Sequence, residues 1–369
     1  MVRVAERLRG FAQPWELACF VWIPTLFVGF TAWYELHNKA TVGDFPIFRA
    51  ASKAVLQGHS PYVAPDPHAL ANFDTFVYPP AAAFLFSPLA VVPYTAAKVL
   101  IVVLGFATAL AALRLLDVRD WRCYGVAAVS APVVNSVALG AFTSFLLLGC
   151  AATWRYRGRP GVTGAIASLT ATAKLFLWPL GVWLLVTKRI RATVVFALVT
   201  VALVVGGWAA IGFAGFHDYP HLLRLLSGLE AHKSFSIVAL LKVSGATSTA
   251  LSVLLVVAVV ASVVAAARGE DGERRAFAVA VLGTLVATPV VWMHYYALLF
   301  VPIALYRPRL SAIWLAPVAL WLVPSTYSEG VTWRILLGLG TVGLVGACVL
   351  GVHWPNLRGR RVMEAVVED

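Results

Sequence analysis

Long apolar runs without charge recur along the chain, and they constrain its fold more than any other feature. Three of the longest cover residues 17–33, 192–213 and 251–267. A helix rises about 1.5 Å per residue, so about 20 apolar residues span a hydrocarbon core of about 30 Å. Only 12% of the residues are charged and 60% are hydrophobic, whereas about a quarter of a soluble domain is charged. The sequence therefore predicts an all-α, polytopic membrane protein of about 12 transmembrane helices.

The apolar runs and the basic residues between them together predict a topology. The predicted helices cover residues 15–33, 76–93, 98–116, 124–151, 161–173, 175–187, 192–213, 248–267, 276–290, 295–306, 310–324 and 332–352. Basic clusters lie at residues 3–9, 155–159, 188–191, 268–275, 307–309 and 358–361. Because loops rich in Lys and Arg stay in the cytoplasm, we expect all six clusters, both termini and the basic tail 353–369 on the cytoplasmic side of the cell membrane. This arrangement leaves Arg114, Arg119 and Arg122 on the outer side, against the rule.

The net charge of +12 is scattered between the apolar runs in short clusters. Such a distribution indicates topology determinants and not a surface for nucleic acid.

Two pairs of predicted helices are too short to span a membrane alone, and they meet near Lys174 and His294. Pairs of this kind dip from one side into a cavity lined by protein, where a break in the helix can be satisfied.

Two longer hydrophilic stretches, residues 34–75 and 214–247, fall on the outer side of what we expect to be a single transmembrane domain, 1–369. In the first loop, Arg49, Lys53 and Gln57 recur at every fourth position, whereas Phe45 and Phe48 fall on the opposite face. This pattern predicts an interfacial amphipathic helix that ends at Gly58.

Asp44 stands at the start of that amphipathic helix and has two readings. It can cap the helix N-terminus, with Pro46 in the first turn. It can also act as a general base that takes a proton from a sugar hydroxyl as the hydroxyl attacks an activated donor. The two roles are compatible, and both remain open at this point.

Other polar and aromatic residues of the loops and helix breaks are candidates for substrate binding. Lys174 is an ammonium in apolar surroundings, which marks a functional site unless its chain snorkels to an interface. The remaining candidates are His59, Tyr62, Tyr78, Arg224, Lys233, Trp292, His294 and Tyr295. The tyrosines also suit an aromatic belt, and Arg224 and Lys233 suit anionic head groups. His217 and His221 have a metal-ligand spacing but no third ligand nearby, so we predict neither a metal site nor a cofactor.

These residues, taken in order, resemble glycosyltransferase family 87, a group of polyprenyl-phosphate-sugar-dependent enzymes of the GT-C class that includes actinobacterial mannosyltransferases of phosphatidylinositol mannoside synthesis. The resemblance is carried by Asp44-Phe45, by Gly58-x-x-Pro61-Tyr62 and by an aromatic-Tyr-Pro-Pro run at residues 76–80. Lys174 before Pro179 and a Pro-x-x-Trp-x-His element at residues 289–294 complete it.

The resemblance implies a GT-C-like fold and an inverting transfer from a polyprenyl-phosphate-linked sugar, most simply mannose, to a lipid or glycan acceptor on the outer face. The loop aspartate, here Asp44, would be the general base. The chain departs from the family pattern at residues 140–143, at Tyr295 and at residues 232–234, and these departures bear on the acceptor and the sugar more than on the reaction class. The sequence shows no Asp-x-Asp motif or glycine-rich nucleotide fold, which argues against a nucleotide-sugar donor.

Two rival functions also fit a chain of about a dozen helices. A lipid or sugar transporter would show inverted repeats with matching broken helices, and we find none. A non-catalytic subunit of an envelope complex would tolerate the loss of Asp44.

Overall fold

The computed structural model describes residues 13–37, 43–62, 70, 75–269 and 271–351, and these residues form helices joined by turns. The basic segments 3–9 and 358–361 and the tail 353–369 lie outside the described residues. The first half contains α2 (Pro14–Leu17), η1 (Ala18–Trp22), α3 (Ile23–His37), α4 (Asp44–Leu56), α6 (Pro80–Val91), α7 (Tyr94–Leu115), α8 (Arg122–Ala128), α9 (Ala131–Ala138), α10 (Thr143–Arg155), α11 (Pro160–Ala173), η2 (Leu175–Leu177) and α12 (Pro179–Val186). The second half contains α13 (Ile190–Ala210), α14 (Tyr219–Glu230), η3 (Ala231–Lys233), α15 (Ile237–Leu241), α16 (Gly245–Ala266), α17 (Gly272–Ala287), η4 (Met293–Leu299), α18 (Phe300–Tyr306), η5 (Ala312–Leu315), η6 (Val318–Leu322) and α19 (Thr332–Leu350).

Five of the described helices are long and apolar enough to cross a membrane one by one. They are Pro14–His37, which joins α2, η1 and α3, together with Tyr94–Leu115, Ile190–Ala210, Gly245–Ala266 and Thr332–Val349. Shorter apolar helices occur at Pro80–Val91, Leu175–Val186, Met293–Tyr306 and Ala312–Leu322. The described residues thus form an all-helical membrane protein, as predicted.

Both predicted pairs of short helices form hairpins that return to the end of the molecule where they start. The first pair is α11 and α12. Arg189, which follows α12, donates a hydrogen bond from its guanidinium group to the carbonyl of Arg157, which precedes α11. The second pair is α17 with η4 and α18, and Arg274 and Arg309 at its two ends line one common cavity. The breaks at Lys174 and His294 therefore lie at the far tips of the two hairpins.

The predicted single helix over residues 124–151 is wrong, and its failure explains the misplaced arginines. The structure divides this stretch into α8, α9 and α10, with a break before Pro132 and a turn at Gly140, whose φ of +62° suits glycine. The extra reversal brings residues 114–122 back to the other basic clusters, and Asp117 forms an ion pair of 3.9 Å with Arg155. Arg114, Arg119 and Arg122 thus lie at the same end as residues 155–159, not at the opposite end.

Residues 310–324 also differ from the prediction, because Pro317 divides them into the short turns η5 and η6.

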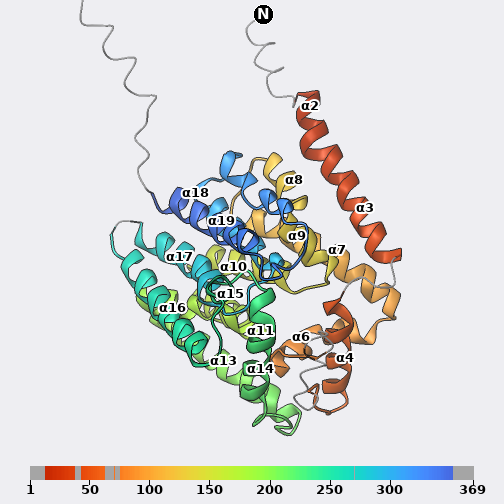
Figure 1. Ribbon diagram of the computed structural model, residues 1–369, viewed down its shortest axis with the longest axis vertical. Coiled ribbons are helices and arrows are strands. Elements are labelled where there is room, and N and C mark those ends of the chain that lie inside the picture. The colour runs from red at the N-terminus through yellow and green to blue at the C-terminus, as the bar shows by residue number, and fades with distance from the viewer. Residues whose placement is uncertain (1–12, 38–42, 63–69, 71–74, 270, 352–369) are drawn as a thin grey trace, which may run out of the picture.

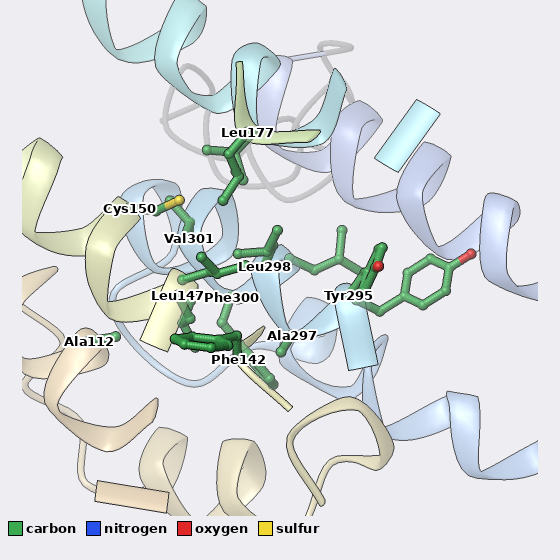
Figure 2. Close-up of a cluster of buried hydrophobic side chains, with 14 of the residues drawn as sticks. Ala112, Phe142, Leu147, Cys150, Leu177, Tyr295, Ala297, Leu298, Phe300 and Val301 are labelled. Atoms are coloured by element: carbon green, nitrogen blue, oxygen red, sulfur yellow. The ribbon is translucent and has the colours of Figure 1, made fainter. Parts of the chain in front are cut away.

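The core lies behind the hairpin tips, where α10 meets η4 and α18. Figure 2 shows Leu147 and Cys150 of α10 beside Leu298 and Val301, with Phe142 and Tyr295 nearby. Trp183 of α12 is fully buried and donates a hydrogen bond of 3.1 Å from Nε1 to the carbonyl of Glu273.

The amphipathic helix predicted in the first loop is α4, and it packs along α6 at the lower end of the molecule in Figure 1. Its apolar residues Phe45, Phe48 and Val55 share one face, and that face is buried inside the protein. The Phe48 ring stacks on Phe86 at 4.8 Å, and Arg49 donates a hydrogen bond of 2.7 Å to the carbonyl of Val92. These contacts hold the start of α4 in a fixed position over the hairpin tips.

Candidate active site

A cavity of about 580 Å³ lies between the start of α4 and the tips of the two hairpins. Its polar part is lined by Asp44, Thr75, Tyr78, Asn135, Lys174, Trp292, His294 and Tyr295. Its apolar part extends between α14 and α16, where Leu223, Leu226, Val253 and Val257 line it. Val253 and Val257 are more than half exposed on the outside of α16. The cavity therefore joins a polar centre to the apolar perimeter of the protein.

Asp44 is the first residue of α4, and Gly43 occupies the N-cap position before it. The prediction that Asp44 caps the helix is therefore wrong. The backbone N–H of Asp44 donates a hydrogen bond of 2.9 Å to the carbonyl of Leu139, at the turn between α9 and α10. This bond fixes the aspartate against the turn at Gly140, and its side chain lines the cavity.

Lys174 lies between α11 and η2, and its backbone is extended, with φ −150° and ψ 106°. Its side chain is 4% exposed, so the alternative of a chain that snorkels to an interface is wrong. The Nζ atom lies 4.1 Å from the centroid of the Tyr295 ring and 5.3 Å from that of Tyr78. Two aromatic faces thus hold the ammonium by cation–π contacts, and within the described residues its Nζ has no hydrogen-bond partner.

The charges of Asp44 and Lys174 act on each other inside the cavity. Burial raises the pKa of Asp44 from 3.8 to about 6, and the positive charge of Lys174 opposes that rise. The carboxylate of Asp44 is consequently a stronger base than an exposed aspartate, yet it is still mostly ionised at neutral pH. That combination suits a general base.

His294 lies at the tip of the second hairpin and is 2% exposed. Its ring meets that of Tyr295 edge to face at 4.8 Å, and neither ring nitrogen has a hydrogen-bond partner within the described part of the chain. The same holds for Thr75 Oγ1 and Asn135 Oδ1, which line the cavity as well. Because buried polar atoms are nearly always paired, these atoms are available to a partner other than the described residues, such as water or a ligand.

Comparison with known proteins assigns the chain to a family. The model of glycosyltransferase family 87 matches residues 76–291, which is more than half of the chain. The chain belongs to glycosyltransferase family 87. Searches of curated proteins and of solved structures gave no significant match. The resemblance found in the sequence is thus confirmed, and the family favours an enzyme over a transporter or a non-catalytic subunit.

The matched residues of this glycosyltransferase include Tyr78, Asn135 and Lys174, whereas Asp44 precedes the match and His294 follows it. The contribution of Asp44 and His294 to the cavity is therefore an observation of the structure. Trp292 meets Tyr327 edge to face at 5.4 Å, and both line the same cavity.

Four of the predicted binding residues of the glycosyltransferase do not line the cavity. Tyr62 stacks on Trp208 at 5.2 Å and donates a hydrogen bond of 2.6 Å to the carbonyl of Tyr78, so it supports the cavity wall from behind. His59 and Arg224 are exposed. Lys233 forms an ion pair of 3.3 Å with the buried Glu230.

Sequence reasoning missed Thr75, Asn135 and Tyr219, which line the cavity. Asn135 carried a usable signal, because an amide within an apolar run needs a polar partner once the run is buried. Tyr219 gave no such signal. Its hydroxyl donates a hydrogen bond of 3.2 Å to the carbonyl of Val77, a contact between residues far apart in the sequence that spacing alone cannot predict.

Proposed function

We propose that this glycosyltransferase moves mannose from a polyprenyl-phosphate donor to the hydroxyl group of a lipid or glycan acceptor, with inversion at the anomeric carbon. The observation that carries the proposal is the shape of the cavity. One end gathers Asp44, Lys174 and His294, and the other opens along α16 toward the lipid-facing perimeter. A donor with a charged sugar-phosphate head and an apolar tail matches both ends.

Asp44 is the proposed general base. It removes the proton of the acceptor hydroxyl as the hydroxyl oxygen forms a bond to the anomeric carbon. The bond between that carbon and the phosphate oxygen breaks, and its electron pair leaves with the phosphate. The pKa of Asp44, raised by burial to about 6, strengthens the carboxylate for this step without protonating it at pH 7.

Lys174 and His294 are the proposed partners of the leaving phosphate. The ammonium of Lys174 is positioned by the rings of Tyr78 and Tyr295, so it needs little rearrangement as negative charge grows on the phosphate oxygens. The ring of His294 offers a donor or acceptor to the phosphate or to a sugar hydroxyl. Thr75 and Asn135 offer further positions for sugar hydroxyls.

We infer that the cavity faces the outer side of the cytoplasmic membrane and that the whole chain forms one GT-C-like domain. Residues 114–122, 155–159, 188–191, 268–275 and 307–309 all belong to the end away from α4 and α14. Under the positive-inside rule that end is cytoplasmic. Residues 34–75 and 214–247 then form the outer loops, where nucleotide sugars are scarce and a lipid-linked donor is the available one.

A donor comparison tests the proposal. Purified full-length protein in detergent is supplied with radiolabelled mannose as polyprenyl-phosphate-mannose or as GDP-mannose, together with a membrane lipid extract as acceptor. We expect label in the lipid or glycan product only with the polyprenyl donor. Polyprenyl-phosphate-arabinose and polyprenyl-phosphate-glucose, supplied in parallel, test the sugar. Equal transfer from GDP-mannose would contradict the proposed donor, and transfer of another sugar in preference would replace mannose alone.

A further inference from the structure

A second cavity, of about 910 Å³, lies at the arginine-rich end, and none of the described residues lines both this cavity and the candidate active site. Its charged lining comes from Asp117, Arg119, Arg155, Arg157, Asp271, Glu273, Arg274 and Arg309. These residues belong to the segment after α7, the end of α10, the start of α17 and the segment after α18. Five arginines thus face three carboxylates around one concave surface.

The three carboxylates of this cavity already have arginine partners. Glu273 forms ion pairs with Arg189, which lies outside the lining, and with Arg157 at 3.6 Å. Asp271 pairs with Arg274 at 3.8 Å, and Asp117 pairs with Arg155 at 3.9 Å. Among the described residues, Arg119 and Arg309 make no ion pair with a carboxylate. Two guanidinium groups of the lining are therefore left for another anion.

A hydrogen bond joins the two segments that carry Arg119 and Arg309. The residue after Arg119 is Asp120, whose Oδ2 accepts a hydrogen bond of 3.0 Å from the backbone N–H of Leu310, the residue after Arg309. Asp120 does not neutralise the two arginines, because its carboxylate accepts hydrogen bonds of 3.0 and 2.9 Å from Nε and Nη2 of Arg122. Arg119 and Arg309 are both exposed and both line this cavity, so their guanidinium groups are accessible to an anion from solution.

A structural role for these arginines explains only part of the cluster. Arg155 stands in the last turn of α10, where a cation stabilises the helix dipole. Arg119 and Arg309 stand beyond the ends of α7 and α18, in segments with irregular backbone. A topology signal alone requires arginines at this end of the protein, but it does not require two of them to converge on one cavity.

We propose that this cavity binds a phosphate group through Arg119 and Arg309, either on the head group of an anionic lipid or on a soluble phosphorylated molecule. The planar guanidinium group presents paired donors that match the geometry of phosphate oxygens. The apolar side chains of Leu116, Leu305 and Pro308 in the same lining suit the neighbouring carbon atoms of either ligand. The site is independent of Asp44, so it stands whether or not the proposed reaction is correct.

Equilibrium binding to the purified full-length protein tests the proposal. The probes are dioctanoyl phosphatidic acid, inorganic phosphate and dioctanoylglycerol, which has the acyl chains but no phosphate. They are titrated into the wild type, into the double variant Arg119→Gln/Arg309→Gln and into Arg159→Gln/Arg191→Gln. The last is the matched control, since Arg159 and Arg191 are exposed at the same end and do not line the cavity.

We expect the Arg119→Gln/Arg309→Gln variant to bind phosphatidic acid, inorganic phosphate or both at least fivefold more weakly than the wild type, and the control variant to bind within twofold of it. Binding of phosphatidic acid alone assigns the ligand to a lipid head group, and binding of inorganic phosphate assigns it to the phosphate itself. Equal affinity of the double variant and the wild type, no binding of either phosphate probe, or equally tight binding of dioctanoylglycerol would overturn the proposal.

A measurement on the wild type covers the case in which the double variant does not fold. Phenylglyoxal modifies accessible arginines, and mass spectrometry of peptides locates the modified residues. With the phosphate probe present, we expect Arg119 and Arg309 to be modified at least fivefold more slowly and Arg191 to be unaffected. Equal protection of all three arginines, or of none, would count against the site.

Discussion

The pH dependence of transfer follows from the environment of Asp44 and can be worked out in detail. Burial raises the pKa of its carboxyl from 3.8 to about 6. A general base acts only when ionised, so activity is present above this pKa and is lost as the pH falls through it. With a pKa of about 6, roughly 90% of Asp44 is ionised at pH 7 and roughly 10% at pH 5, so the rate falls about tenfold between them.

The pH at which the rate falls on the acidic side of the profile, its acid limb, also depends on the charge of Lys174. The ammonium favours the ionised form of Asp44, and it holds the pKa of Asp44 below the value that burial alone would give. In Lys174→Met that opposition is lost, so the pKa of Asp44 rises and the acid limb moves to higher pH. His294→Gln is the matched control, because it removes a second titratable group of the same cavity but leaves the acid limb in place.

The assay is the initial rate of label transfer from pH 4.5 to pH 8, with folding checked at each pH by size-exclusion chromatography. A rate that is flat between pH 5 and pH 7 in the folded wild type would refute the assignment of Asp44 as the base. Loss of the acid limb in His294→Gln would show that His294, and not Asp44, is the general base. An acid limb that moves to lower pH in Lys174→Met would refute the proposed coupling between the two charges.

Three further predictions concern the support of the cavity and the packing of the helices. Gly164→Val should lower the Tm by several degrees, because a Cβ at Gly164 would lie 2.4 Å from the carbonyl oxygen of Ala192. Gly161→Ala, where the added Cβ has open space, should not lower the Tm. A Tm of Gly164→Val equal to that of the wild type would contradict the packing of α11 on α13. Tyr62→Phe should keep the ring stack on Trp208 but lose the 2.6 Å hydrogen bond to the carbonyl of Tyr78, which contributes about 1 kcal/mol. The rate of transfer should then fall a fewfold with the fold retained. Unchanged kinetics would show that this hydrogen bond does not position the cavity wall. Asn135→Leu should raise KM or lower kcat at least tenfold without lowering the Tm, and wild-type kinetics would exclude the amide from substrate binding.

The residues of the candidate site were largely predictable from the sequence, because each stood out against its surroundings. Asp44 opens an amphipathic helix, and Lys174 and His294 are ionisable residues at breaks between short apolar helices, where function is the default expectation. Their convergence was not predictable in the same way. It depends on the hydrogen bond from Asp44 to Leu139 and on the two hairpins that bring distant breaks to one place.

The failures of prediction have identifiable physical causes. The stretch 124–151 is apolar throughout, so hydropathy alone could not divide it, although Pro132 and Gly140 were available as signals. This missed reversal placed Arg114, Arg119 and Arg122 at the wrong end, together with the predicted crossing at 76–93, where α6 has only 12 residues and its C-terminal end stays beside α4. Tyr62, a predicted binding residue, stacks on Trp208 and does not line the cavity, and such a contact across 146 residues leaves no local trace in the sequence.

The most direct test of the central claim is the transfer activity of Asp44→Asn. Asparagine keeps the size and polarity of aspartate but cannot take the proton from the hydroxyl group of the acceptor. The matched control is Asp218→Asn, which makes the same substitution at an exposed aspartate outside the cavity. Transfer from polyprenyl-phosphate-mannose is measured for both variants and for the wild type, with the Tm of each. We expect Asp44→Asn to lose at least a hundredfold in rate without a lower Tm, and Asp218→Asn to match the wild type. Equal transfer by folded Asp44→Asn and by the wild type would contradict the account.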